Sequence, residues 1–290
     1  MNFLKKLMCA AAITLGTTGA AIASPVLNNW VFNPNGGGFA GGQVINEYLD
    51  FNGNAFIQLT ATGNNAFTFK ETAVFNALQA DSNGKLFPLK YPGGNISATF
   101  TATGSGEFGG AFSFNGGTIR LYRNPVYGQY AGTTGYYGAN VGEMIAEFDV
   151  LAGGGGRVDA NGSPTSNGQV SVFAHAAPGM LDAGYFYNGA GRDLSTSSVL
   201  SFAFTNANTL GSPTRDMVSE VACQFAQFTG PGCTGGRYSN RAREYFFIGS
   251  NGQFKLAELN EVPEPGTLAL FGVALLATGA VSRKRKASQK

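Results

Sequence analysis

The chain has 290 residues, of which 43 are glycine and only 12% are charged. Between Ser24 and Val262 it carries twelve Lys and Arg against sixteen Asp and Glu, a net charge of about −4, which gives no support for a nucleic-acid-binding surface. The scarce charge, the many glycines and the abundant Phe favour twisted strands joined by tight turns.

The first 23 residues have the order of a secretory signal peptide. Lys5 and Lys6 form a positively charged start, and the run from Leu7 to Ile22 is apolar or small apart from three threonines. Small residues at Ala21 and Ala23 form a cleavage site, so we expect cleavage after Ala23. The run is short and broken by glycine, which disfavours a permanent membrane anchor. We therefore expect export by the Sec machinery.

Several segments of the body alternate in the manner of strands and are separated by Asn-Gly and Gly-Gly turn signals. Only Glu71–Ala80 is compatible with a helix, and residues 153–168 are expected to form a long polar loop or an interruption between sheets. Asn115-Gly116-Gly117 is a candidate hairpin turn. The predicted strands are Phe56–Thr62, Ala66–Phe69, Ile96–Ala102, Ala111–Phe114, Thr118–Tyr122, Met144–Leu151, Gln169–Ala174, Val199–Thr205 and Tyr245–Ile248.

This pattern predicts an all-β fold. We expect residues 24–260 to form a single antiparallel β-sandwich-like or jelly-roll-like domain. An N-terminal signal helix would precede this domain, and a short C-terminal transmembrane helix would follow it.

Two cysteines remain once the signal peptide is removed, Cys223 and Cys233. An oxidising compartment would join them in a disulfide, and closing a loop of this size contributes roughly 2–3 kcal/mol of stability. The alternative is a metal or redox pair, but the Cys-x-x-Cys spacing is absent and the only histidine, His175, is far away in the sequence.

One acidic run is the best enzyme candidate. On a strand, Glu143, Glu147 and Asp149 would share one face, and glycosidases use two carboxylates about 5–10 Å apart. The run from Glu147 to Val150 resembles half of the Glu-x-Asp-x-x-Glu site of some jelly-roll glycosidases, without the second glutamate. A solvated acidic strand face explains these residues equally well. We therefore predict no catalytic residues, and the solitary His175 lacks a Gly-x-Ser-x-Gly elbow.

A tyrosine-rich segment is a candidate glycan contact, because aromatic faces stack on sugar rings while Arg and Asn bond hydroxyl groups. The alternative is that these rings pack a long loop against the sheet. The residues are Tyr122, Tyr127, Tyr130, Tyr136 and Tyr137.

No motif indicates a cofactor or a metal. The glycines of residues 153–156 lack the Gly-Lys-Ser/Thr of a phosphate loop. The turns beginning at Asp81 and Asp159 lack the ligand count of an EF-hand. We expect neither kind of group.

The C-terminus has three parts in order. A proline-rich sequence, Val262-Pro263-Glu264-Pro265-Gly266, is followed by the apolar stretch Thr267–Ser282. As a helix this stretch would reach about 24 Å at ~1.5 Å per residue, which is short for a ~30 Å hydrocarbon core. By the positive-inside rule, the basic cluster that ends it should stay in the cytoplasm; it comprises Arg283, Lys284, Arg285 and Lys286.

Residues 261–286 resemble the PEP-CTERM sorting signal of Gram-negative bacteria. The match comprises Pro263-Glu264-Pro265, the apolar run and the basic cluster. The resemblance implies transient anchoring in the inner membrane, processing by an exosortase near Pro263-Glu264-Pro265, and release to the cell surface or the exopolysaccharide matrix. An anchor that is not processed is the alternative.

The body also loosely resembles the flocculation-associated PEP-CTERM proteins. The matching features are Val44–Tyr48, Thr118–Pro125, the cysteine pair and Phe246–Phe254. This resemblance implies a non-enzymatic role in exopolysaccharide-dependent aggregation of cells, in flocs or biofilm. Two alternatives are a secreted glycan-active enzyme using Glu143, Glu147 and Asp149, and an adhesive subunit that self-associates through a sheet edge.

Overall fold

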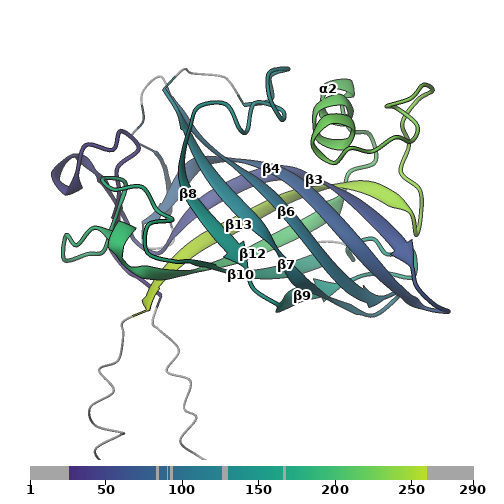
Figure 1. Cartoon of the computed structure of the whole chain (residues 1–290), viewed down its shortest axis with the longest axis horizontal. Coiled ribbons are helices and arrows are strands. Elements are labelled where there is room, and N and C mark those ends of the chain that lie inside the picture. Colours follow the sequence, from purple (N-terminus) through teal and green to yellow (C-terminus); the bar gives the residue numbers. More distant parts are fainter. Residues whose placement is uncertain are drawn as a thin grey trace, which may run out of the picture. The chain divides into compact units, whose positions relative to one another are not determined.

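The computed structural model describes residues 26–82, 85–89, 91, 94–125, 130–165 and 168–259. Eight long antiparallel strands tilt around a common axis and close into a barrel (Figure 1). They are β3 (Tyr48–Ala61), β4 (Ala66–Ser82), β6 (Asn95–Glu107), β7 (Ala111–Asn124), β8 (Glu143–Val150), β10 (Gly168–Ala176), β12 (Ser198–Thr209) and β13 (Tyr245–Leu259).

Each barrel strand pairs with the next one along the chain, and the last pairs with the first. Strand β13 runs antiparallel to β3, with Phe247 opposite Phe56 and Asn251 opposite Asn52. The expected β-sandwich or jelly roll is therefore wrong, although the all-β antiparallel class is confirmed. Two packed sheets would need connections that cross between layers, whereas a closed meander needs only hairpins and one closing pair.

An additional strand, β9 (Gly153–Arg157), lies where a long polar loop was predicted. Strands β8 and β9 both lie between β7 and β10, so together they act as one interrupted strand. Gly154 and Gly155 have φ values of +66° and +116°, and a Cβ on Gly155 would lie 2.0 Å from the Phe112 carbonyl oxygen. Glycine is needed here for close backbone approach.

Two other local predictions are wrong. Residues Glu71–Ala80 lie in β4, because pairing with β3 and β6 overrides their helix propensity. Asn115-Gly116-Gly117 does not form a hairpin turn, since β7 runs through it. The register between β6 and β7 shifts at Thr103 and Gly104 opposite this segment, which is the effect of a β-bulge.

A small sheet packs at one end of the barrel. It contains β11 (Phe186–Tyr187), β1 (Trp30–Phe32) and β2 (Gln43–Ile45), in that order. Trp30 and Phe32 are fully buried and belong to the same hydrophobic cluster as the barrel interior. In the chain, the 3-10 turn Phe39–Gly41 lies between β1 and β2, and the 3-10 turn Leu194–Thr196 follows β11. The short β5 (Lys85–Pro88) pairs with β4.

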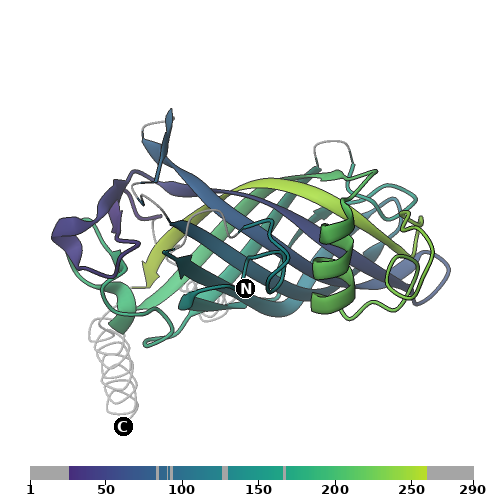
Figure 2. The same ribbon diagram turned by 90° about the horizontal axis from the view of Figure 1, so that it is seen from above.

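A helix lies across the outside of the barrel (Figure 2). It starts as α2 (Arg215–Met217) and continues as the π-helical segment η3 (Val218–Phe225). The Thr214 hydroxyl caps it by accepting a hydrogen bond from the Met217 N–H at 3.2 Å. Its buried side chains form an outer cluster with barrel residues, comprising Phe56, Val74, Tyr137, Ala139, Met217, Val218, Val221, Ala222, Tyr245 and Phe247.

The predicted signal helix and C-terminal membrane helix lie outside the described residues. Within residues 26–259, as far as the structure describes them, no helix is long and apolar enough to cross a membrane.

Candidate functional site

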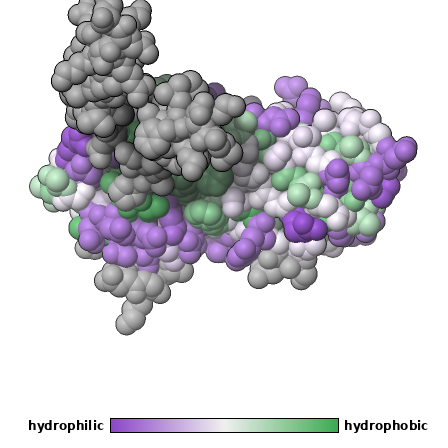
Figure 3. Space-filling model, turned by 90° about the horizontal axis from the view of Figure 1, so that it is seen from below, coloured by the Kyte–Doolittle hydropathy of each residue, from purple (hydrophilic) through white to green (hydrophobic). Residues whose placement is uncertain are grey.

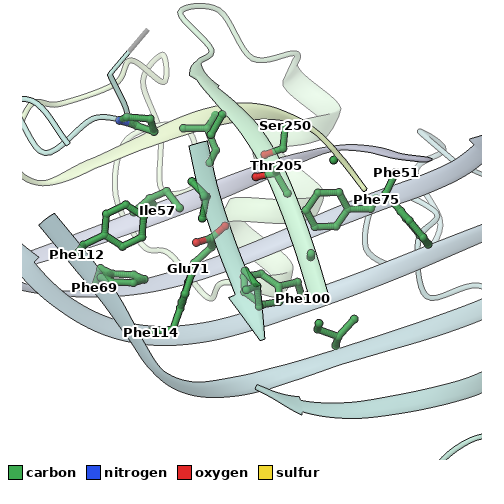
Figure 4. Close-up of a pocket in the computed structure, with 18 of the residues that line it drawn as sticks. Phe51, Ile57, Phe69, Glu71, Phe75, Phe100, Phe112, Phe114, Thr205 and Ser250 are labelled. Carbon is green, nitrogen blue, oxygen red and sulfur yellow. The ribbon is translucent and has the colours of Figure 1, made fainter. Parts of the chain in front are cut away.

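The barrel interior holds a cavity of about 110 Å³ (Figure 4). Alternate residues of each strand point inward, and Phe67, Phe69, Glu71 and Phe75 of β4 line the cavity. The wall is otherwise almost entirely phenylalanine and aliphatic side chains. The site is therefore an apolar chamber that contains one carboxyl group.

Glu71 has unusual surroundings for an acidic side chain. Its cross-strand neighbours are Ile57 on β3 and Ala102 on β6. The part of its surface that remains accessible faces the cavity. Protein surrounds the carboxyl group, and this burial raises its pKa to about 8. Isolated carboxyls with raised pKa values are a recurring mark of binding and catalytic sites.

A second site lies on the outer face of the barrel, where asparagines from three strands line a groove of about 620 Å³. Asn206 on β12, Asn251 on β13 and Asn52 on β3 stand directly opposite one another across the two strand pairs. Gly249 has no side chain, which leaves part of the floor of this groove open. We call this the asparagine groove; it is lined by Asn52, Gly53, Asn54, Tyr130, Asn206, Asn208, Gly249, Ser250 and Asn251.

Hydrogen bonds orient the amides of this groove. Asn251 Nδ2 donates to Asn52 Oδ1 at 2.6 Å, and Asn52 Nδ2 donates to Asp50 Oδ2 at 3.3 Å. Burial raises the pKa of Asp50, and hydrogen bonds from Asn52 and Asn251 oppose that shift. The amide groups are thus held in place, while Asn52, Asn206 and Asn251 remain exposed.

The acidic run lies on β8, and its glutamates face arginines of the neighbouring strand. Arg120 Nε lies 2.5 Å from Glu147 Oε2, and Arg123 Nη2 lies 2.6 Å from Glu143 Oε2. The Tyr185 hydroxyl also donates a hydrogen bond to Glu143 at 3.3 Å. Both glutamates are therefore engaged in cross-strand ion pairs, which are the ordinary contacts of an exposed sheet surface.

His175 makes one notable contact. Its Nε2 lies 2.6 Å from the Ser198 hydroxyl oxygen, and Asp149 stands opposite it on β8. These residue types are those of a serine hydrolase triad. The contacts of the described residues include no hydrogen bond between His175 and Asp149, so the base lacks the orienting partner that a triad requires.

The tyrosines of the candidate glycan contact mostly pack against protein. Tyr136 stacks on Phe225 with ring centroids 4.1 Å apart, and Tyr130 contacts Tyr137 edge-on at 5.6 Å. Burial raises the pKa of Tyr130, whose hydroxyl bonds the Val74 carbonyl. Tyr137 is only 9% exposed, so this geometry favours packing of the loop. Tyr127 lies outside the described residues, and sugar contact by Tyr122 stays a prediction.

The predicted disulfide between Cys223 and Cys233 is confirmed, with Cα atoms 5.4 Å apart. It ties the end of the outer helix to the following loop. Sequence reasoning missed this helix, although the spacing of Val218, Val221, Ala222 and Phe225 is that of an amphipathic helix. It also missed Glu71 and the asparagines, whose placement depends on strand register.

The outer surface mixes polar and apolar residues. On the face shown in Figure 3, hydrophobic residues form separate patches between hydrophilic and intermediate ones. Phe204 on β12 is an exposed aromatic side chain, with 44% of its surface accessible. Phe202 on the same strand contacts Phe173 on β10 edge-on, and the centroids of these two rings are 5.8 Å apart.

The family model of the PEP-CTERM protein-sorting motif matches residues 261–286, so the chain carries this sorting motif. This motif indicates an exported protein that an exosortase processes, with a sorting tail that is anchored only transiently in the membrane. The matched residues include Pro263-Glu264-Pro265 and the basic cluster, which lie outside the described residues. No curated protein and no solved structure matches the chain.

Proposed function

We propose that the processed protein is a non-enzymatic component of the cell surface or extracellular matrix that associates with exopolysaccharide in flocs or biofilm. The sorting motif supports delivery to that location. The asparagine groove is the observation that carries the proposed binding.

Polysaccharides present rows of hydroxyl groups, each of which both donates and accepts hydrogen bonds. An Asn side chain has a carbonyl acceptor and two N–H donors, so neighbouring amides match hydroxyl rows. Asn206, Asn251 and Asn52 form such a row across β12, β13 and β3. The glycine floor lets a ring approach the sheet closely.

The alternative functions receive less support. Closure of the barrel pairs both edges of each of its eight strands, which removes the long sheet edge that self-association would use. The enzyme alternative needs free carboxylates, whereas Glu143 and Glu147 pair with Arg123 and Arg120.

The test is co-sedimentation of the protein with exopolysaccharide purified from the producing strain. Replacing Asn206 and Asn251 by alanine should reduce the bound fraction at least fivefold. The matched control replaces two exposed polar residues that stand opposite each other on β3 and β4 outside the groove, Thr60 and Thr68, and should leave binding unchanged.

Equal retention of both double variants would refute the role of the groove. If neither the unaltered protein nor the control sediments with the polymer, the association with exopolysaccharide itself is wrong. Circular dichroism spectra of each variant establish that the barrel is intact.

A further inference from the structure

The interior of the barrel is a binding chamber that the proposed role on the matrix does not use. An eight-stranded barrel is either filled by side chains or wide enough for one small ligand. Here Phe69, Phe100 and Phe114 contribute to a wall that leaves about 110 Å³ empty (Figure 4). An apolar cavity of 150 Å³ accommodates benzene, so this volume suits a ligand of about that size or slightly smaller.

The polar groups of the chamber are few. Figure 4 shows the oxygen atoms of Glu71, Thr205 and Ser250, and the other labelled residues have only carbon in their side chains. Gln253 is a further polar residue of the lining. Glu71 is the single ionisable side chain among the described residues that line the cavity. Its neighbours in the adjacent strands, Ile57 and Ala102, offer it neither a charge nor a hydrogen bond.

A carboxyl group in such surroundings is costly, because burying a polar group without a partner destabilises a fold. The flanking inward positions of β4 are Phe69 and Ala73, so an apolar residue at position 71 would continue the pattern of the core. Burial alone raises the pKa of Glu71 to about 8. The contacts of the described residues include no hydrogen bond or ion pair to this carboxyl group.

We propose that the barrel interior binds a small apolar molecule carrying a primary amine, with its apolar part among the phenylalanines and its ammonium group on the Glu71 carboxylate. The negative charge of the ionised Glu71 side chain favours a ligand that carries a positive charge. No described residue of the wall carries a positive charge, so an anionic ligand would enter without a counter-ion. A neutral alcohol would gain a hydrogen bond but no ion pair.

Three probes with the same isopropyl group, each smaller than benzene, separate these possibilities: isobutylamine, isobutyl alcohol and isobutyrate. Calorimetric titration of the full chain at pH 8 should show isobutylamine binding at least tenfold more tightly than isobutyrate. Glu71→Gln should weaken isobutylamine at least tenfold and change isobutyl alcohol less than threefold. The control Glu107→Gln removes an exposed carboxylate at the end of β6 and should bind all three probes as the unaltered protein does.

A second variant tests the location of the ligand. Ala98 is buried and lines the cavity, so Ala98→Leu should fill the chamber and abolish binding of isobutylamine and of isobutyl alcohol. Retention of isobutylamine binding in this variant, with an intact near-ultraviolet dichroism spectrum, places the ligand elsewhere and overturns the proposal.

A measurement on the unaltered protein does not depend on how the variants fold. NMR titration of the Glu71 carboxyl carbon should show its pKa falling by at least one unit when isobutylamine is added, because an ammonium partner favours the ionised form. An unchanged pKa, a lack of isobutylamine binding at millimolar concentration, or equal affinity for isobutyrate would each refute the proposal. These outcomes are independent of whether the outer surface binds polysaccharide.

Discussion

Asn251 donates a hydrogen bond of 2.6 Å to Asn52, although the two residues are 199 positions apart in the chain. They face each other where the last barrel strand pairs with the first. The bond therefore exists only because the barrel closes, and it places two strands of the asparagine groove side by side.

The closing strand pair should depend on packing more than on this exposed bond. Asn251→Ala should lower the free energy of unfolding by about 1 kcal/mol or less. Phe247 lies four residues earlier on β13, in the outer cluster, and is 0% exposed. Phe247→Ala should lower the free energy of unfolding by about 3–5 kcal/mol, because it leaves a cavity. Urea denaturation measures both values. A larger loss for Asn251→Ala than for Phe247→Ala would contradict this view of closure.

Glu71 should make the barrel less stable as the pH rises. Burial raises its folded pKa from 4.5 to about 8, so between these values the folded state holds a proton that the unfolded state has released. Stability is therefore lost from pH 4.5 upward, by at most about 1.4 kcal/mol per pH unit, and becomes independent of this group above pH 8. Glu71→Gln should abolish this contribution. Chemical denaturation at several pH values measures the free energy of unfolding of both proteins. The same dependence on pH in the unaltered protein and in Glu71→Gln would contradict the prediction.

The disulfide should stabilise the outer helix and its loop. Cys223 and Cys233 are separated by 10 positions, and opening a loop of this size costs roughly 2–3 kcal/mol in the chain-entropy model. Replacing both cysteines by serine should lower the denaturation midpoint accordingly. Hydrogen exchange should accelerate first around Val221, and a uniform acceleration through the barrel strands would show that the bond supports the whole fold.

We expect no polysaccharide hydrolysis by the unaltered protein, and none by a variant in which the three carboxylates of β8 are replaced by alanine. Exposed ion pairs such as Arg120–Glu147 contribute about 0–1 kcal/mol each, so the triple variant at Glu143, Glu147 and Asp149 should fold with a modest loss of stability. Reducing-end assays on the purified polymer provide the measurement. Hydrolysis by the unaltered protein that the folded variant lacks would establish the enzyme alternative.

The mature protein should lack both chain ends. We expect cleavage after Ala23 and near Pro263-Glu264-Pro265, because the sorting motif holds the tail in the membrane only until an exosortase acts. Intact-mass measurement of protein from the culture matrix tests this. A secreted species that retains Leu268–Lys290 would contradict it, and in a strain without the exosortase the protein should remain in the membrane fraction.

The sequence by itself determined the sorting tail, the disulfide and the all-β antiparallel class. Each depends on local order: a proline motif followed by an apolar run and a basic cluster, two cysteines around a Gly-Pro-Gly turn, and short-range alternation. Only the tertiary structure decided that the strands close into a barrel, because the pairing of Phe247 with Phe56 joins segments with no local relation. Closure also turned Glu71 inward from a segment whose composition favours a helix. It aligned Asn206, Asn251 and Asn52 as well, since strand register depends on the whole sheet and not on neighbours in the chain.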